Sequence, residues 1–227
     1  MSEPISIDIW SDIACPWCYI GKRNLEKGIA AVSADADAPQ VSVTFHSYEL
    51  SPDTPLDYEG NSGDYFIEHR GMPRPQLEQM QQQVVAAASA AGLEYDLDAQ
   101  KHANTARAHE LIHFAKAQNR QGEMKERLMS AYFSEGRGIG SIDDLTELAG
   151  EAGLDRDAAR TAMASGQFRD DVAADKEQAR AYGITGVPFF VINGQYGISG
   201  AQPPEAFENV LRDLWAKRNE ETTAAAE

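Results

Sequence analysis

The chain has 227 residues, of which 20 are Lys or Arg and 36 are Asp or Glu, so its formal net charge at pH 7 is −16. This surplus of negative charge argues against polyanionic partners, and we expect the protein to bind neither nucleic acid nor an anionic membrane. The length fits one large domain, or one domain that carries an insertion, and it is enough to bury a hydrophobic core without disulfide staples.

The N-terminal residues bear on where the protein is located. Residues 1–4 lack the basic stretch and the apolar run that begin a secretory signal. No apolar run elsewhere in the sequence reaches the length of a transmembrane helix. We therefore expect a cytoplasmic protein, and in that compartment structural disulfides are rare.

The first 48 residues predict a strand, a helix and a second strand. Isoleucines at positions 5, 7 and 9 alternate with other side chains, which is the period of a strand. A helical pattern runs from Pro16 to Val32, and alternation returns from Val41 to His46. This order predicts a βαβ unit, with a parallel strand pair and a right-handed crossover.

The only two cysteines of the chain, Cys15 and Cys18, stand at the start of this helix in the motif Cys-Pro-Trp-Cys. Pro16 suits the first helical position, where its missing N–H group is not needed. Cys15 would then lie at a helix N-terminus, where free N–H groups and the helix dipole stabilise a thiolate. We therefore expect Cys15 to be the attacking thiolate and Cys18 the resolving thiol.

Two other interpretations of the cysteine pair stay open. A structural zinc site needs four ligands, and the sequence has no second C-x-x-C motif. An inert structural disulfide is also compatible with the spacing, although such bonds are rare in the cytoplasm.

The middle of the chain has a helical period, and strand signals return only near its end. Helices are expected over 65–70, 76–91, 104–118, 123–135, 143–152, 155–164 and 169–182. The run Phe189–Ile192, an Asn-Gly turn and the residues 195–198 predict a β-hairpin. A last helix is expected over 205–217, and residues 219–227 are expected to form a flexible, frayed tail.

The third strand is entered through Gly186-Val187-Pro188-Phe189. A proline at this position cannot donate a hydrogen bond to a β-ladder. The residues alone leave two conformations open: a trans proline at a sheet edge, which is the commoner case, and a cis Val187–Pro188 peptide.

Together these features resemble a known family. Cys-Pro-Trp-Cys after the first strand of a βαβ unit, and Gly-Val-Pro before an Asn-Gly hairpin, resemble the two halves of a thioredoxin fold. With the helical insertion between them, the chain resembles the DsbA family of oxidoreductases. It is most similar to the cytosolic FrnE-like branch at 15–22, 48–52, 104–105 with His109, 131–133 and 200–202. The resemblance covers the chain from about Ile5 to Lys217.

The resemblance implies an α/β fold class: a thioredoxin fold with an all-α helical insertion. Residues 1–62 and 183–218 would form a discontinuous thioredoxin-like domain, and 63–182 an inserted helical domain. It further implies that Pro188 is cis and lies against the cysteine pair. The backbone of Val187 would pair with an extended substrate segment, which Pro16 and Trp17 would also contact.

The implied activity is that of a thiol–disulfide oxidoreductase or isomerase. A mixed disulfide would form at Cys15 and be resolved by Cys18, without a bound cofactor or metal. The implied substrates are proteins that carry thiols or disulfides, and glutathione or a thioredoxin-type reductant is a possible redox partner. The dipeptide between the cysteines lacks a histidine, so a strongly oxidising potential is not expected. The second cysteine pair of some FrnE-like members is also missing.

Two further functions remain open. Kappa-class glutathione transferases and 2-hydroxychromene-2-carboxylate isomerases resemble the same fold, and they bind glutathione at the equivalent helix N-terminus. They usually have Ser where this chain has Cys15, so the presence of both cysteines counts against them. A non-catalytic chaperone would use the groove between the helical insertion and the core, and its action would survive a Cys15→Ser substitution.

Two other motifs have weaker support. His109 to His113 matches the H-E-x-x-H motif of zinc metalloproteases, with Glu110 as the base. No convincing third ligand follows, so we expect an ordinary amphipathic helix. The glycine-rich stretch 136–141 resembles a phosphate loop, but it lacks a preceding strand and a Lys-Ser/Thr end, so it is expected to connect two helices. His46 is expected on a strand face near the site.

Overall fold

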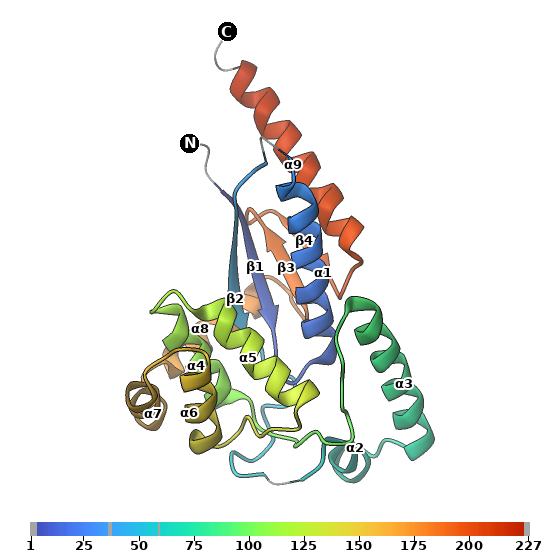
Figure 1. Ribbon diagram of the computed structural model, residues 1–227, viewed down its shortest axis with the longest axis vertical. Helices are drawn as coiled ribbons and strands as arrows, with labels where there is room; N and C mark the ends of the chain where they lie inside the picture. The colour runs from blue at the N-terminus through green and yellow to red at the C-terminus, as the bar shows by residue number, and fades with distance from the viewer. Residues whose placement is uncertain (1–3, 36–37, 59, 225–227) are drawn as a thin grey trace.

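The computed structural model describes residues 4–35, 38–58 and 60–224, in which nine helices surround a four-stranded mixed sheet (Figure 1). The strands are β1 (Ile5–Ser11), β2 (Val41–Ser47), β3 (Phe189–Ile192) and β4 (Tyr196–Ser199). The helices are α1 (Pro16–Ser33), α2 (Ser62–Arg70), α3 (Arg74–Ala91), α4 (Ala106–Lys116), α5 (Gln121–Ser134), α6 (Ile142–Glu151), α7 (Arg156–Ser165), α8 (Arg169–Ala181) and α9 (Pro204–Ala224).

The sheet has the strand order β2-β1-β3-β4. β1 is parallel to β2 and antiparallel to β3, and β3 and β4 form the hairpin predicted at Asn193-Gly194. Asn193 and Gly194 both have positive φ angles, as the turn requires. The side chain of Asn193 also accepts a hydrogen bond of 3.0 Å from the Ser6 N–H group of β1. The predicted βαβ unit and the α/β fold with a helical insertion between β2 and β3 are confirmed.

Two helices, α1 and α9, cover one face of the sheet (Figure 1). The alternating isoleucines of β1 point to this face, where Leu25 and Phe207 join the same buried cluster. The helices approach closely at Gly28, because a Cβ atom there would lie 2.8 Å from the Cβ of Phe207 and 2.9 Å from the carbonyl oxygen of Pro204. The opposite face of the sheet buries Trp10 against α8 and the segment that follows it.

The helices between β2 and β3 have a separate core, and this core includes the two cysteines. Cys15 and Cys18 belong to the same buried cluster as Leu128 and Phe133 of α5. Gln121, at the start of α5, also uses its side-chain amide to bond both the N–H and the C=O group of Phe45, at 3.0 and 2.8 Å. This clamp satisfies part of the open edge of β2 and fixes α5 next to the sheet.

Some helix boundaries differ from those predicted. α2 begins at Ser62, because the Asn61 side chain accepts a hydrogen bond from the Gly63 N–H group and caps the helix. α9 continues to Ala224, through most of the segment expected to be a frayed tail. Glu and Ala, which recur in that segment, are strong helix formers. Residues 225–227 lie outside the described part of the chain.

In the described residues, none of the helices combines the length and the apolar character that crossing a membrane requires.

Substitution of Gly28 tests the contact between α1 and α9. Gly28→Ala is expected to lower the free energy of unfolding by about 1–3 kcal/mol, because the new methyl group meets backbone and a Cβ atom that cannot move aside. The loss outweighs the gain in helix propensity of up to about 1 kcal/mol. Urea unfolding measures it, with Gly122→Ala in α5, where a Cβ atom meets open space, as the control. Equal stability of Gly28→Ala and wild type would contradict the packing described.

Candidate active site

The motif Cys-Pro-Trp-Cys forms the first turn of α1, directly after β1. Cys15 is the N-cap residue, with φ −88° and ψ 112°, and Pro16 takes the first helical turn as predicted. Cys15 has no side-chain capping bond, so its sulfur does not occupy the N–H groups of the turn. Cys15 therefore lies at the N-terminal end of α1, where the helix dipole is positive.

Both cysteines are free thiols, and both are almost fully buried. The Cys15 thiol is 3.6 Å from the carbonyl oxygen of Val187, to which it donates a hydrogen bond. Burial, together with the hydrogen bond and charge of Cys15, raises the pKa of Cys18 well above its ordinary value. Cys18 is thus held as a neutral thiol beneath Cys15. This is the protonation state expected of a resolving residue before a mixed disulfide has formed at Cys15.

Lys125 of α5 is a buried cation near this pair. It is 1% exposed, its ammonium group is 3.4 Å from the Ser11 carbonyl oxygen, and it lies 5.8 Å from the centre of the Phe45 ring. Burial lowers the pKa of Lys125 to about 8, although the charges of Cys18 and Asp12 favour its protonated form. The same ammonium group acts in the opposite sense on Cys18, whose pKa it lowers.

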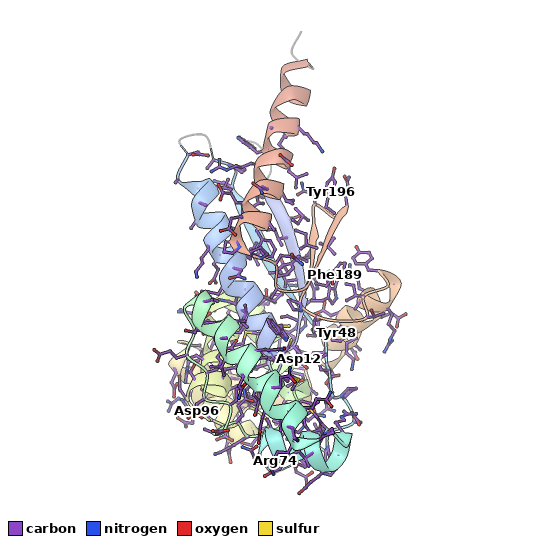
Figure 2. The ribbon with its side chains drawn as sticks, turned by 90° about the vertical axis from the view of Figure 1, so that its right-hand side faces the viewer. Asp12, Tyr48, Arg74, Asp96, Phe189 and Tyr196 are labelled. Atoms are coloured by element: carbon purple, nitrogen blue, oxygen red, sulfur yellow. The ribbon has the colours of Figure 1, made fainter. Side chains whose placement is uncertain are left out.

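Asp12, which is labelled in Figure 2, lies in the turn between β1 and α1, three residues before Cys15. Its carboxylate accepts hydrogen bonds from the N–H groups of Leu50, at 2.8 Å, and of Ala14, at 3.5 Å. His109 Nε2 lies 3.3 Å from the same carboxylate and 3.1 Å from the carbonyl oxygen of Tyr48, so this nitrogen is a donor. Burial alone would raise the pKa of Asp12, but the bond from His109 and the other donors lower it. The carboxylate is therefore charged at neutral pH.

The structure places Val187 and Pro188, which enter β3, beside the Cys-Pro-Trp-Cys motif. The Val187–Pro188 peptide is cis, as the resemblance implies. Pro188 is buried against Gly21 of α1, where a Cβ atom would lie 3.0 Å from its ring. Val187 is partly buried, and Pro16, whose carbonyl oxygen accepts a 2.9 Å hydrogen bond from Tyr95, is also partly accessible. Trp17 is exposed beside the sulfurs.

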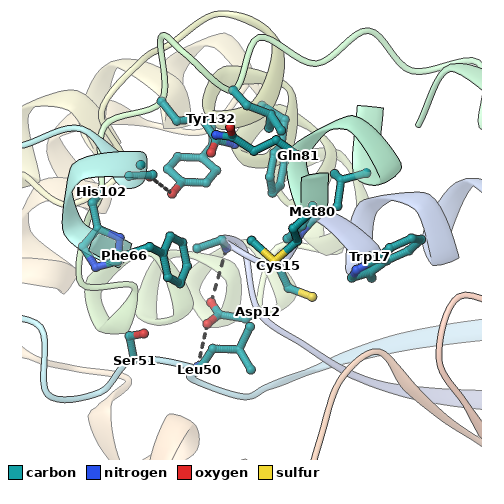
Figure 3. A pocket seen from close by; sticks show the side chains of 18 of the residues that line it. Asp12, Cys15, Trp17, Leu50, Ser51, Phe66, Met80, Gln81, His102 and Tyr132 are labelled. Atoms are coloured by element: carbon teal, nitrogen blue, oxygen red, sulfur yellow. Dashed lines mark hydrogen bonds between the residues drawn. The ribbon is translucent and has the colours of Figure 1, made fainter. Parts of the chain in front are cut away.

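A cavity of about 300 Å³ adjoins these residues, and Cys15, Pro16, Trp17 and Val187 all contribute to its wall (Figure 3). The other walls come from the loop after β2, from α2 and α3, from the segment between α3 and α4, and from α5. All six residues predicted from the sequence for this site thus belong to one region, in which Cys18 and Pro188 are buried and do not line the cavity.

Two residues of this region, Asp12 and Lys125, were not singled out from the sequence. Asp12 precedes the motif by three positions, and an Asp that accepts a hydrogen bond from the N–H two residues later is a common turn device. Lys125 carries no such signal, because a lysine in an amphipathic helix usually points to solvent.

The two histidines of the H-E-x-x-H motif in α4 contact different carboxylates. His109 contacts Asp12, whereas His113 Nε2 is 3.0 Å from Asp175 of α8 and 3.1 Å from the hydroxyl of Ser47. Within the ranges 4–35, 38–58 and 60–224, no three His, Cys, Asp or Glu side chains gather as a metal-binding group. The glycine-rich stretch 136–141 connects α5 to α6, as predicted.

Asp175 forms the centre of an ion-pair network that joins α8 and α4 to β2. Its carboxylate contacts His46 Nδ1 at 2.7 Å and accepts a 2.7 Å bond from the Ser47 N–H group, while His46 Nε2 is 2.8 Å from Asp8. Burial opposes the charge of His46, but bonds to Asp175 and Asp8 outweigh it and raise the pKa of His46. The bonds from His113 and His46 likewise outweigh burial and hold the pKa of Asp175 well below its usual range.

The comparisons with known proteins agree on one family. Residues 6–212 match the model of the DSBA-like thioredoxin domain. The crystal structure of a probable DsbA oxidoreductase from Streptomyces coelicolor is 36% identical, covers 93% of this chain and 90% of that chain, and has a TM-score of 0.86. YwbO of Bacillus subtilis (strain 168), described as uncharacterized, is 30% identical over 94% of this chain and 99% of its own length.

A solved structure of 2-hydroxychromene-2-carboxylate isomerase covers 95% of this chain and 98% of that chain, with a TM-score of 0.70. Its sequence identity is 14%, so this likeness concerns the fold alone.

The network around Asp175 gives a pH-dependent prediction. Asp175→Asn is expected to lower the free energy of unfolding by about 2–4 kcal/mol near pH 6, because two histidines lose a buried anion. The stability that Asp175 contributes is lost as pH falls below about 4, through its lowered folded pKa. The stability that protonated His46 contributes is fully present below about pH 6.5. It is lost as the pH rises through the pKa of His46 in the folded state, which is raised.

The difference between wild type and variant should therefore be largest between about pH 4 and 6.5. Urea unfolding over a pH series measures it, with the exposed Asp171→Asn on the same helix as the control. A penalty that is independent of pH would show that the network is not ionised as described.

Proposed function

Because the chain belongs to the DSBA-like thioredoxin domain family, we propose that it is a thiol–disulfide oxidoreductase whose reaction takes place at Cys15 and Cys18. The observation that carries this proposal is the unequal setting of the two thiols. Cys15 is the N-cap residue of α1 and lines the cavity, whereas Cys18 does not line it and has a raised pKa. This difference between the two thiols is expected of a nucleophile and a resolving thiol. A structural disulfide does not require the two cysteines to differ.

In the proposed reaction, the Cys15 thiol loses its proton and its bond to the Val187 carbonyl group. The thiolate attacks one sulfur of a substrate disulfide, and the second substrate sulfur leaves as a thiolate that takes up a proton. Cys18 then loses its proton and attacks Cys15, which releases the first substrate sulfur and leaves a Cys15–Cys18 disulfide. Two electrons pass from the cysteine pair to the substrate, and the reverse sequence oxidises a substrate dithiol.

The other residues of the site have supporting roles in this proposal. Lys125 provides a buried positive charge that stabilises the Cys18 thiolate as it forms, in line with its effect on the pKa of Cys18. Val187, with Pro16 and Trp17, forms the surface beside Cys15 that a substrate would contact, and Pro188 supports that surface. No metal or bound cofactor is needed. Glutathione or a thioredoxin-type protein in the cytoplasm would return the pair to its reduced state.

An isomerase or transferase that uses glutathione is the second candidate, because that group shares the fold. Its members usually have Ser at the position of Cys15, so they lack the pair of cysteines that this chain has. The presence of Cys18 therefore favours the redox reaction.

Substitution of each cysteine separates the two steps. Cys15→Ser is expected to reduce disulfide turnover to the level without enzyme, because the nucleophile is gone. Cys18→Ser should still attack, so that one substrate thiol remains bound to Cys15 as a stable mixed disulfide. Mass spectrometry of the intact protein, before and after reduction, detects this adduct. If Cys18→Ser turns over at the wild-type rate, the assignment of Cys18 as resolving thiol is wrong.

The role of Lys125 can be tested through the second step alone. Lys125→Met retains the volume and removes the charge, so the pKa of Cys18 should rise further. The resolving step should slow by up to about tenfold for each pKa unit, because the thiolate fraction falls tenfold per unit. Stopped-flow measurements of attack and resolution provide the ratio of the two rates, and Lys116→Met, which removes an exposed charge from α4, is the control. An unchanged ratio would exclude the proposed role.

A further inference from the structure

The cavity beside Cys15 has the chemical character of a binding site for an apolar group. Its volume is about 300 Å³, about twice the roughly 150 Å³ that holds one benzene molecule in an engineered apolar cavity. Phe66 of α2, Leu77, Met80 and Val84 of α3, and Phe133 of α5 line it (Figure 3). A space of this size and lining matches small-molecule sites in general, which are mostly apolar and preformed.

Most polar groups in the wall are bonded to the protein itself, and the exception is the side-chain amide nitrogen of Gln100, which is buried without a hydrogen-bond partner in the described part of the chain. The hydroxyl of Tyr132 bonds to Ser62 at 2.9 Å, and the Asp12 carboxylate is engaged by Leu50 and His109. Burial, with the nearby Arg70, lowers the pKa of His102 to about 4, so this residue is uncharged at neutral pH. No Lys or Arg is found among the described residues of the lining. The described lining therefore has no cationic side chain that would balance the charge of an anionic ligand, and the Asp12 carboxylate would oppose one.

The burial of Cys15 limits what kind of disulfide can reach it. Cys15 is 3% exposed, with the Val187 carbonyl group on one side and the cavity on another. A disulfide in a folded protein holds two backbone segments about 4.4–6.8 Å apart, and both would have to approach this buried sulfur. A small disulfide avoids that difficulty, because one of its arms can enter the cavity and bring its own sulfur to Cys15.

We propose that the cavity binds the uncharged, apolar arm of a small-molecule disulfide, and that Cys15 attacks the sulfur attached to this arm. This inference rests on the function proposed above and names its substrate class. The Cys15–S bond forms as the substrate S–S bond breaks, and the outer arm leaves as a thiolate that is then protonated. Cys18 afterwards displaces the apolar thiol from Cys15. The reduced cysteine pair supplies both electrons, and a monothiol such as glutathione would regenerate it.

The test uses three 2-pyridyl disulfides that differ only in the second arm: phenethyl, hydroxyethyl or carboxyethyl. All release the same pyridine-2-thione, so the leaving group is constant and its absorbance reports the attack. The fully reduced protein is mixed with each compound in single-turnover experiments. Each rate constant is divided by the rate constant of dithiothreitol with the same compound, which removes differences in intrinsic reactivity.

The phenethyl compound is expected to react at least tenfold faster than the hydroxyethyl compound, because a buried phenyl ring leaves water. The carboxyethyl compound should be the slowest. Two variants reduce the space: Val84→Phe, deep in the wall, and Met80→Trp, at a position that is 36% exposed and tolerates a large side chain. Both should lower the phenethyl preference to within about twofold of unity. Val85→Phe, the next residue on α3 but 40% exposed and outside the cavity lining, should retain the wild-type preference.

The possible failures can be told apart. Equal normalised rates for the three compounds in the wild type would overturn the inference and leave the oxidoreductase function standing. A preference that survives in Met80→Trp, shown by circular dichroism to be folded, would also overturn it. If the wild type reacts with none of the compounds faster than Cys15→Ser does, the proposed function itself fails.

Discussion

The first turn of α1 is held between parts of the chain that are far apart in the sequence, and the properties of both cysteines depend on this position. The Val187 carbonyl group contacts Cys15 from one side, and Tyr95 bonds to the carbonyl group of Pro16 from another. Lys125 lies buried near the inner thiol. An isolated helix N-terminus would favour a thiolate at either sulfur within reach of its free N–H groups. The surroundings make the two sulfurs different, because burial, together with the hydrogen bond and charge of Cys15, raises the pKa of Cys18 well above its ordinary value.

Burial of both cysteines in the core of the inserted helices also gives these helices a part in the proposed reaction. The sheet with α1 and α9 has its own apolar core, to which none of the described residues between β2 and β3 contributes. The cysteines instead belong to the core of the inserted helices, and α5 brings both Lys125 and part of the cavity wall to them. Two polar devices fix the insertion in place: Gln121 holds α5 to the edge of β2, and Asp175 joins α8 and α4 to β2. Since these contacts are hydrogen bonds with defined geometry, they determine the position of α4 and α5 more precisely than apolar packing alone would.

The sequence predicts those parts of the molecule whose causes are local. The alternation in β1, Pro16 after Cys15, and the Asn-Gly turn each act within a few residues, and the corresponding elements are found where they were expected. Contacts between distant segments leave no such pattern. Lys125 lies in a predicted helix, but nothing in that helix indicates that its side chain turns inward to the cysteines. The same holds for His46, expected on a strand face, whose partners Asp8 and Asp175 come from β1 and α8. The extent of α9 was underestimated, because polar helix formers at a chain end look like a tail.

The burial of Cys15 limits which substrates can reach its sulfur, and the Cys-Pro-Trp-Cys motif alone does not indicate this limit. A nucleophile at the tip of a helix would accept any disulfide that diffuses to it, and its selectivity would be set by redox potential. Here the sulfur is enclosed, so a substrate must also fit the space next to it. That space is bounded mainly by α2, α3 and α5, which belong to the insertion, and by Trp17 and Val187 of the thioredoxin-like part. The same burial that keeps Cys18 protonated thus restricts access to Cys15. Reactivity and substrate selection are consequently coupled, because any change in the packing of α3 or α5 against α1 alters both.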